Sequence, residues 1–115
     1  MKIVDRVFGW ILLLFGLLHT AVGVVLLSRT LNLDSAWFFS GGLAVIFCAF
    51  LNLVRSQRAD RLIAGTSVIA NLLLVVLSVV LWWVLRHDLK ANPQAAMFVP
   101  LIVIELLFSV RQWLK

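Results

Sequence analysis

The chain has 115 residues, of which 63% are hydrophobic and only 13% are charged, and its mean hydropathy is +1.11. Soluble domains are roughly 45–50% apolar and about 25% charged, so this composition excludes an ordinary soluble domain and also excludes disorder. The net charge of +5 comes from Lys and Arg between and outside apolar runs, which indicates membrane topology and anionic headgroups, not nucleic acid. We expect a single integral membrane domain over 1–115.

Four apolar segments predict transmembrane helices, because about 20 apolar residues cross the hydrocarbon core. Their expected bounds are about 7–27, 36–54, 62–85 and 95–113. The connections are short and carry helix signals: Asp34, Ser35 and Asp60 can cap the helices that follow them. Asn92 before Pro93 is a strong helix start. Short loops force neighbouring helices to be antiparallel, so the predicted fold class is an all-α, up-down-up-down bundle.

The Lys and Arg residues near the span ends predict the orientation. One face would hold both termini and the middle loop, with seven basic residues: Lys2, Arg6, Arg55, Arg58, Arg61, Arg111 and Lys115. The other face has three: Arg29, Arg86 and Lys90. The positive-inside rule therefore places both termini in the cytoplasm, and we expect a bacterial inner membrane. An aromatic belt would place Trp10 and Trp113 at the inner interface and Trp37, Trp82 and Trp83 at the outer one.

The first span carries a stripe of small residues. Gly9, Gly16 and Gly23 recur every seven residues, and His19 lies on the same stripe. Glycines let helix backbones approach closely, so the stripe predicts a packing seam. Two interpretations of His19 stay open: a hydrogen bond across the seam, or a ligand, proton-transfer or haem-binding position.

The second and third spans also carry small or polar residues on one side. Ala44, Cys48 and Asn52 follow i, i+4 spacing, which indicates helix packing. Cys48 is the only cysteine of the chain, so an intramolecular disulfide is excluded and a small buried side chain is expected. Asn71 in the third span is either a hydrogen-bonded link between helices or a ligand contact.

The fourth span contains Glu105, Ser109 and Gln112 at i, i+4 and i+7. An ionisable residue inside a membrane is a functional-site hypothesis by default, and a buried carboxyl must be able to release a proton. At 1.5 Å per residue, Glu105 lies about 9 Å from the inner edge, Asn71 about 13–14 Å and His19 about 18 Å. Convergence of these three in the bundle interior is the arrangement that best keeps them from lipid.

Two resemblances concern the layout and the first span. The length and the four spans are similar to the small multidrug-resistance transporters, which carry an essential Glu in the first helix; the first span here has none. The stretch 15–23, FGLLHTAVG, is similar to the opening helix of DoxX-like small membrane proteins. We transfer no function from either resemblance.

The predicted function is a module that binds or transports a small, partly apolar ligand or lipid in the bundle interior, with proton coupling through Glu105. The candidate ligand-binding or proton-transfer residues are His19, Asn71, Glu105 and Ser109. A pathway through so few helices predicts a homo-oligomer or a larger complex. Two alternatives stay open: an accessory subunit of a membrane complex, and a membrane enzyme or a haem or quinone site using His19 and Glu105. We predict no catalytic set, no metal site, no resident cofactor and no nucleic-acid partner.

Overall fold

The computed structural model describes residues 2–88, 90 and 93–115, and this part of the chain is all-helical. The helices are α1 (Lys2–Arg29), α2 (Leu33–Gln57), α3 (Arg61–Leu85) and α4 (Pro93–Trp113). Each of the four helices in this described part is long and apolar enough to cross a membrane. The molecule measures 46 × 27 × 21 Å, and its longest dimension exceeds the roughly 30 Å of a hydrocarbon core.

The helix starts depend on capping side chains more than on the apolar pattern. Asn32 is the N-cap of α2, and its side chain accepts from the backbone N–H of Ser35 at 2.9 Å. The Ser35 hydroxyl accepts from the Asn32 backbone at 3.2 Å, which completes a capping box. The predicted caps Asp34 and Ser35 are therefore wrong, since the cap lies before both. Asp60 caps α3 by accepting from two backbone N–H groups, as predicted. The predicted cap Asn92 lies outside the described residues.

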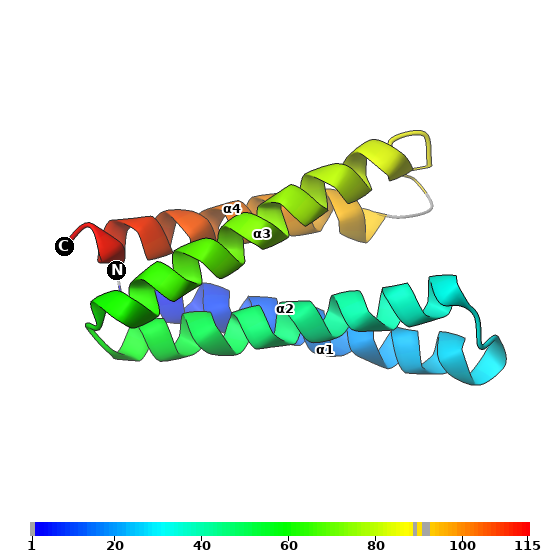
Figure 1. Ribbon diagram of the computed structural model, residues 1–115, viewed down its shortest axis with the longest axis horizontal. Helices are drawn as coiled ribbons and strands as arrows, with labels where there is room; N and C mark the ends of the chain where they lie inside the picture. The colour runs from blue at the N-terminus through cyan, green and yellow to red at the C-terminus, as the bar shows by residue number, and fades with distance from the viewer. Residues whose placement is uncertain (1, 89, 91–92) are drawn as a thin grey trace.

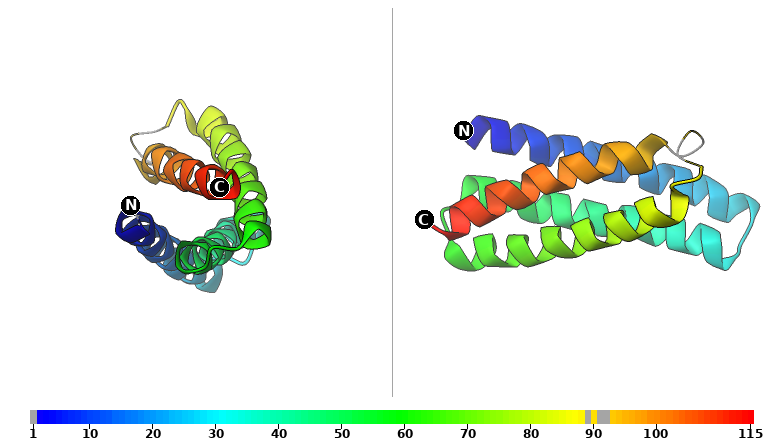
Figure 2. Two further views of the ribbon diagram at one scale, coloured as in Figure 1. Left: turned by 90° about the vertical axis from the view of Figure 1, so that its left-hand side faces the viewer. Right: turned by 90° about the horizontal axis from the view of Figure 1, so that it is seen from above.

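The four helices are arranged so that both chain ends and the α2–α3 link lie at one end of the molecule (Figure 1). Seen end-on, the helices follow one another around the long axis in chain order (Figure 2). Helices α1 and α2 run side by side along their length. Helix α3 starts beside the end of α2 and diverges from it toward the opposite end (Figure 1). The α1–α2 pair and the α3–α4 pair therefore lie closest together at the end that holds the termini.

Close packing of α1 on α2 depends on glycines. Gly9, Gly16 and Gly23 are all buried against α2. A Cβ added to Gly16 would lie 3.0 Å from the backbone nitrogen of Ile46, and one added to Gly23 would lie 2.8 Å from Cα of Phe39. These distances are too short for a side chain, so the glycines set the distance between the two helix backbones.

The exterior of the bundle is apolar, and its interior holds both an apolar core and many polar side chains. Large apolar side chains are exposed along the helices, among them Phe47, Leu73 and Val84. Buried polar residues are as prominent as the buried apolar ones: Asp5, Ser35, Asn52, Arg55, Ser56, Ser67, Asn71, Ser78, Glu105 and Ser109. A bundle with an apolar exterior and polar groups paired in its interior suits a lipid surrounding, where polar groups must find partners inside the protein.

Candidate functional site

Arg55, near the C-terminal end of α2, lies at the centre of the polar interior, and its side chain is 0% exposed. Its Nη1 donates to Asp5 Oδ2 at 2.9 Å and its Nη2 donates to Asp5 Oδ1 at 2.5 Å. Such a bidentate pair is among the stronger polar contacts in proteins. The same Nη2 also donates to Glu105 Oε2 at 3.0 Å. Arg55 therefore joins a carboxylate of α1 to a carboxylate of α4.

Two amide side chains complete the surroundings of the guanidinium group. Arg55 Nε donates to Asn52 Oδ1 at 3.3 Å, and Nη1 donates to Gln112 Oε1 at 3.3 Å. Gln112 Nε2 in turn donates to the carbonyl oxygens of Arg55 and Arg58, at 3.0 and 2.7 Å. Carbonyl groups in the last turn of a helix lack helical partners. Gln112 therefore fastens α4 to the end of α2.

Asn52 and Asn71 form a reciprocal amide pair one turn farther from the chain ends. Asn52 Nδ2 donates to Asn71 Oδ1 at 2.9 Å, and Asn71 Nδ2 donates to Asn52 Oδ1 at 2.8 Å. Asn71 Nδ2 also donates to Ser109 Oγ at 2.8 Å. The Cys48 thiol donates to Asn71 Oδ1 at 3.0 Å. The pair thus links α2 to both α3 and α4.

These connected side chains form one group, which we name the polar cluster. Its eight members are Asp5, Cys48, Asn52, Arg55, Asn71, Glu105, Ser109 and Gln112. Every helix contributes at least one member. A buried polar group without a hydrogen-bond partner is costly, so the shared hydrogen bonds hold the four helices in one register.

Glu105 is the one carboxylate of the polar cluster that is incompletely paired. Its side chain is 0% exposed, and Oε2 accepts from Arg55. Its Oε1 is buried without a hydrogen-bond partner among the residues that the structure describes. Asp5 and Glu105 carry two negative charges against the single positive charge of Arg55 when all three are ionised. Because an unbalanced buried charge is unfavourable, Oε1 is a place where a proton or a ligand donor can bind.

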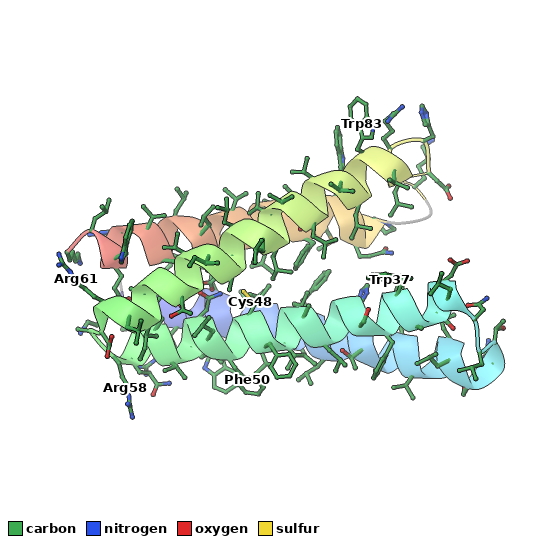
Figure 3. The ribbon with its side chains drawn as sticks, in the orientation of Figure 1. Trp37, Cys48, Phe50, Arg58, Arg61 and Trp83 are labelled. Atoms are coloured by element: carbon green, nitrogen blue, oxygen red, sulfur yellow. The ribbon has the colours of Figure 1, made fainter. Side chains whose placement is uncertain are left out.

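A cavity of about 340 Å³, which we name the end cavity, opens beside the polar cluster at the end that holds both termini. Asp5, Arg55 and Gln112 line it on the cluster side. Arg58 and Arg61, labelled at this end in Figure 3, line it on the side of the α2–α3 link. The polar cluster is therefore reached from the charged end of the molecule.

Three of the four predicted ligand-binding or proton-transfer residues are brought together. Asn71 donates to Ser109, and the Ser109 hydroxyl donates to the backbone oxygen of Glu105 at 2.8 Å. His19 lies elsewhere, with its ring stacked on Phe38 of α2 at a centroid distance of 3.9 Å. The reason is depth: the 1.5 Å rise per residue separates His19 from Glu105 by roughly 9 Å along the bundle, which is too far for direct contact.

Cys48 and Ala44, which the sequence places together on a helix-packing face of the second span, lie in different surroundings in the structure. Cys48 is buried but donates to Asn71, so it belongs to the polar cluster. Ala44 is exposed and makes no seam within the described chain. Ala44 and Arg55 are eleven residues apart and share one face of α2, yet only Arg55 is buried. The physical reason is the divergence of α3 from α2, which leaves this face open beside Ala44 (Figure 1).

Asp5 and Arg55 are the members of the polar cluster that the sequence reasoning missed. From the sequence, Arg55 is one of the basic residues near the span ends that predict the orientation, and Asp5 precedes the first predicted span. A signal existed for Arg55, which completes an i, i+4, i+7 pattern with Cys48 and Asn52, the same spacing as the polar residues of the fourth span. A weaker signal existed for Asp5, which lies four residues before Gly9 and so extends the glycine stripe.

Comparisons with known proteins add no family to this description. No family model matches the chain, and no curated protein or solved structure matches it. Within the described ranges, no three His, Cys, Asp or Glu residues are grouped so as to hold a metal ion. The polar cluster and the end cavity are therefore the features on which a function must be built.

Proposed function

We propose that this chain is an integral membrane protein whose helices cross the bilayer in antiparallel, up-down-up-down order. The apolar exterior and the buried polar groups that pair with one another inside the bundle support this proposal. Without the buried Arg55, six basic residues remain at the end with the termini, against three at the other. The positive-inside rule assigns the more basic end to the cytoplasm, and we propose a bacterial inner membrane. Trp37 and Trp83, toward the opposite end (Figure 3), fit an interfacial belt.

We propose further that the protein binds a small, partly apolar ligand at the polar cluster and exchanges a proton at Glu105 as it does so. The observation that carries this proposal is the buried Glu105 carboxylate, with one oxygen held by Arg55 and the other without a partner in the described chain. A ligand hydroxyl or amine can donate to that oxygen. Phe108, which also lines the end cavity, offers a surface for the apolar part of the ligand.

Arg55 links ligand binding in the end cavity to protonation of Glu105. A ligand in the end cavity reaches the polar cluster at Asp5, Arg55 and Gln112, which line the cavity. Any ligand group that draws the guanidinium toward the cavity weakens its hydrogen bond to Glu105, and the carboxylate then gains a proton to stay neutral in its buried site. Binding and proton uptake are thereby linked through one side chain. Transport would need a second opening, and we propose that a homo-oligomer supplies it.

Infrared difference spectroscopy tests the proton exchange. The protein is reconstituted in liposomes, and spectra are compared between acidic and alkaline buffer. We expect a carbonyl band from a protonated carboxyl in the wild type, lost in Glu105→Gln and kept in Asp34→Asn, a matched control on the exposed surface of α2. An unchanged band in Glu105→Gln would assign the proton to another residue and refute this part of the proposal.

Native mass spectrometry of the protein in mild detergent tests ligand binding. We expect a reproducible extra mass on an oligomer of the wild type, with its occupancy reduced in Glu105→Gln. Ser40→Ala is the control, because the Ser40 hydroxyl is exposed and donates only to Trp37 of its own helix among the described contacts. An extra mass equally occupied in both variants would place the ligand outside the polar cluster. A bare protein would refute the binding function.

The second candidate function is an accessory subunit of a larger membrane complex. One observation favours it: Ala36, Ser40 and Ala44 are exposed at i, i+4 and i+8 on α2. In membranes, such small residues let a second helix approach closely. A stable homo-oligomer of the isolated chain would count against this function, and a bare, unstable monomer would favour it.

A further inference from the structure

Two hollows share one lining residue, Arg61, the first residue of α3. The end cavity lies on one side of it, between the chain ends and the α2–α3 link. On the other side is an apolar groove of about 600 Å³ along the start of α3, which Trp113 of α4 also lines. We name it the Trp113 groove. Arg61 lines both hollows, so a ligand with two chemically different parts can occupy them together.

The end cavity is strongly basic. The basic residues that line it are Lys2, Arg55, Arg58, Arg61, Arg111 and Lys115. Arg55 and Asp5 form an ion pair and offset each other, which leaves five basic lining residues against Asp60, whose side chain accepts from the first backbone N–H groups of α3. The field in the cavity is therefore positive, and the group that complements it is an anion such as a phosphate.

The Trp113 groove has the opposite character. Leu62, Val68 and Ile69 line it, and the hydroxyl of the neighbouring Thr66 is turned back to donate to a carbonyl of its own helix. Gly65 keeps the groove open, because a Cβ at this position would lie 3.3 Å from Nε1 of Trp113. An apolar groove along a helix that faces lipid suits a hydrocarbon chain.

We propose that an anionic phospholipid binds at this end of the molecule, with its phosphate group in the end cavity and one acyl chain in the Trp113 groove. Charge complementarity selects the anionic headgroup, and an apolar groove that shares Arg61 with the basic cavity favours a lipid over a free phosphate. The phosphate would lie beside Arg58 and Arg61, whereas the ligand proposed above uses the cluster side of the same cavity, at Asp5, Arg55 and Gln112, and exchanges its proton at Glu105. Variants of Arg58 and Arg61 and variants of Glu105 therefore test the two proposals separately.

Lipid titration followed by native mass spectrometry tests the proposal. The detergent-solubilised protein is titrated with phosphatidylglycerol and, separately, with phosphatidylcholine of the same acyl chains. We expect phosphatidylglycerol to bind more tightly, and Arg58→Gln/Arg61→Gln to weaken it about 30-fold, since each basic residue near an anionic headgroup contributes roughly a factor of five. Arg6→Gln is the matched control, because Arg6 is exposed at the same end but does not line the end cavity.

Two further measurements separate the outcomes. Gly65→Leu fills the groove without changing charge, and we expect it to weaken phosphatidylglycerol while leaving the far-ultraviolet circular dichroism spectrum unchanged. Calorimetry with inorganic phosphate tests the other source of the anion. Phosphate binding together with full lipid affinity in Gly65→Leu would assign the cavity to a free anion and overturn the lipid proposal. An equal loss of lipid in Arg6→Gln would reduce the effect to general surface charge and would also overturn it.

Discussion

Replacement of Arg55 by methionine is the most direct test of the polar cluster. The substitution keeps most of the side-chain volume but removes the positive charge that pairs with both Asp5 and Glu105. It also removes the N–H groups that donate to the side-chain oxygens of Asn52 and Gln112. Two carboxylates then remain in a buried site, with no cation facing them in the contacts that the structure describes.

The expected loss of stability follows from these contacts. Removing one partner of a buried ion pair costs about 3–5 kcal/mol, because the other charge stays buried without compensation. Arg55→Met leaves two such charges, so we expect a loss in the upper part of that range. Replacing Asp5, Arg55 and Glu105 together by apolar residues of similar volume should recover most of it, since a neutral, well-packed core is often as stable as a buried ion triad.

The assay is reversible unfolding in mixed micelles, followed by circular dichroism as the fraction of denaturing detergent increases. Arg58→Met is the matched control, because Arg58 is exposed just beyond the end of α2, and surface substitutions change stability by about 0.5 kcal/mol or less. If Arg55→Met and Arg58→Met have the same small effect, Arg55 is an interfacial charge that extends to water, and the buried cluster is refuted.

Three further substitutions test the packing, the cap and the amide pair by the same unfolding assay. Gly23→Val should destabilise the protein by about 1–3 kcal/mol, because its Cβ meets the Phe39 backbone; Gly41→Ala, whose nearest contact would be an ordinary 3.8 Å, should be neutral or slightly stabilising. Equal effects would contradict a seam set by glycines. Asp60→Ala should cost about 1 kcal/mol and Asp60→Asn much less; equal losses would point to a role for the charge instead. Asn71→Leu should cost about 1–2 kcal/mol, and an unchanged midpoint would show that the amide pair contributes nothing net.

The sequence predicts some members of the polar cluster and not others. Glu105 and Ser109 were found from their spacing, because a carboxyl and a hydroxyl in an apolar helix are conspicuous. Arg55 is not predicted to belong to the site, because the sequence is the same for two positions of a cation near the end of a span. The side chain can extend into the interfacial water, or it can be buried against acidic residues. The choice depends on whether other helices present carboxylates at that depth, which no single segment contains.

The amino-acid sequence by itself determined the helical class and the approximate extent of all four helices, because about 20 apolar residues between polar loops admit few alternatives. It also determined the glycine stripe of α1, since residues seven apart share one face of a helix. Only the tertiary structure decided that Asp5 and Glu105 meet at Arg55, that His19 lies apart from them, and that Ala44 is left exposed. The physical reason is that periodicity defines the face of a residue on its own helix, whereas contacts between helices depend on their relative depth and divergence.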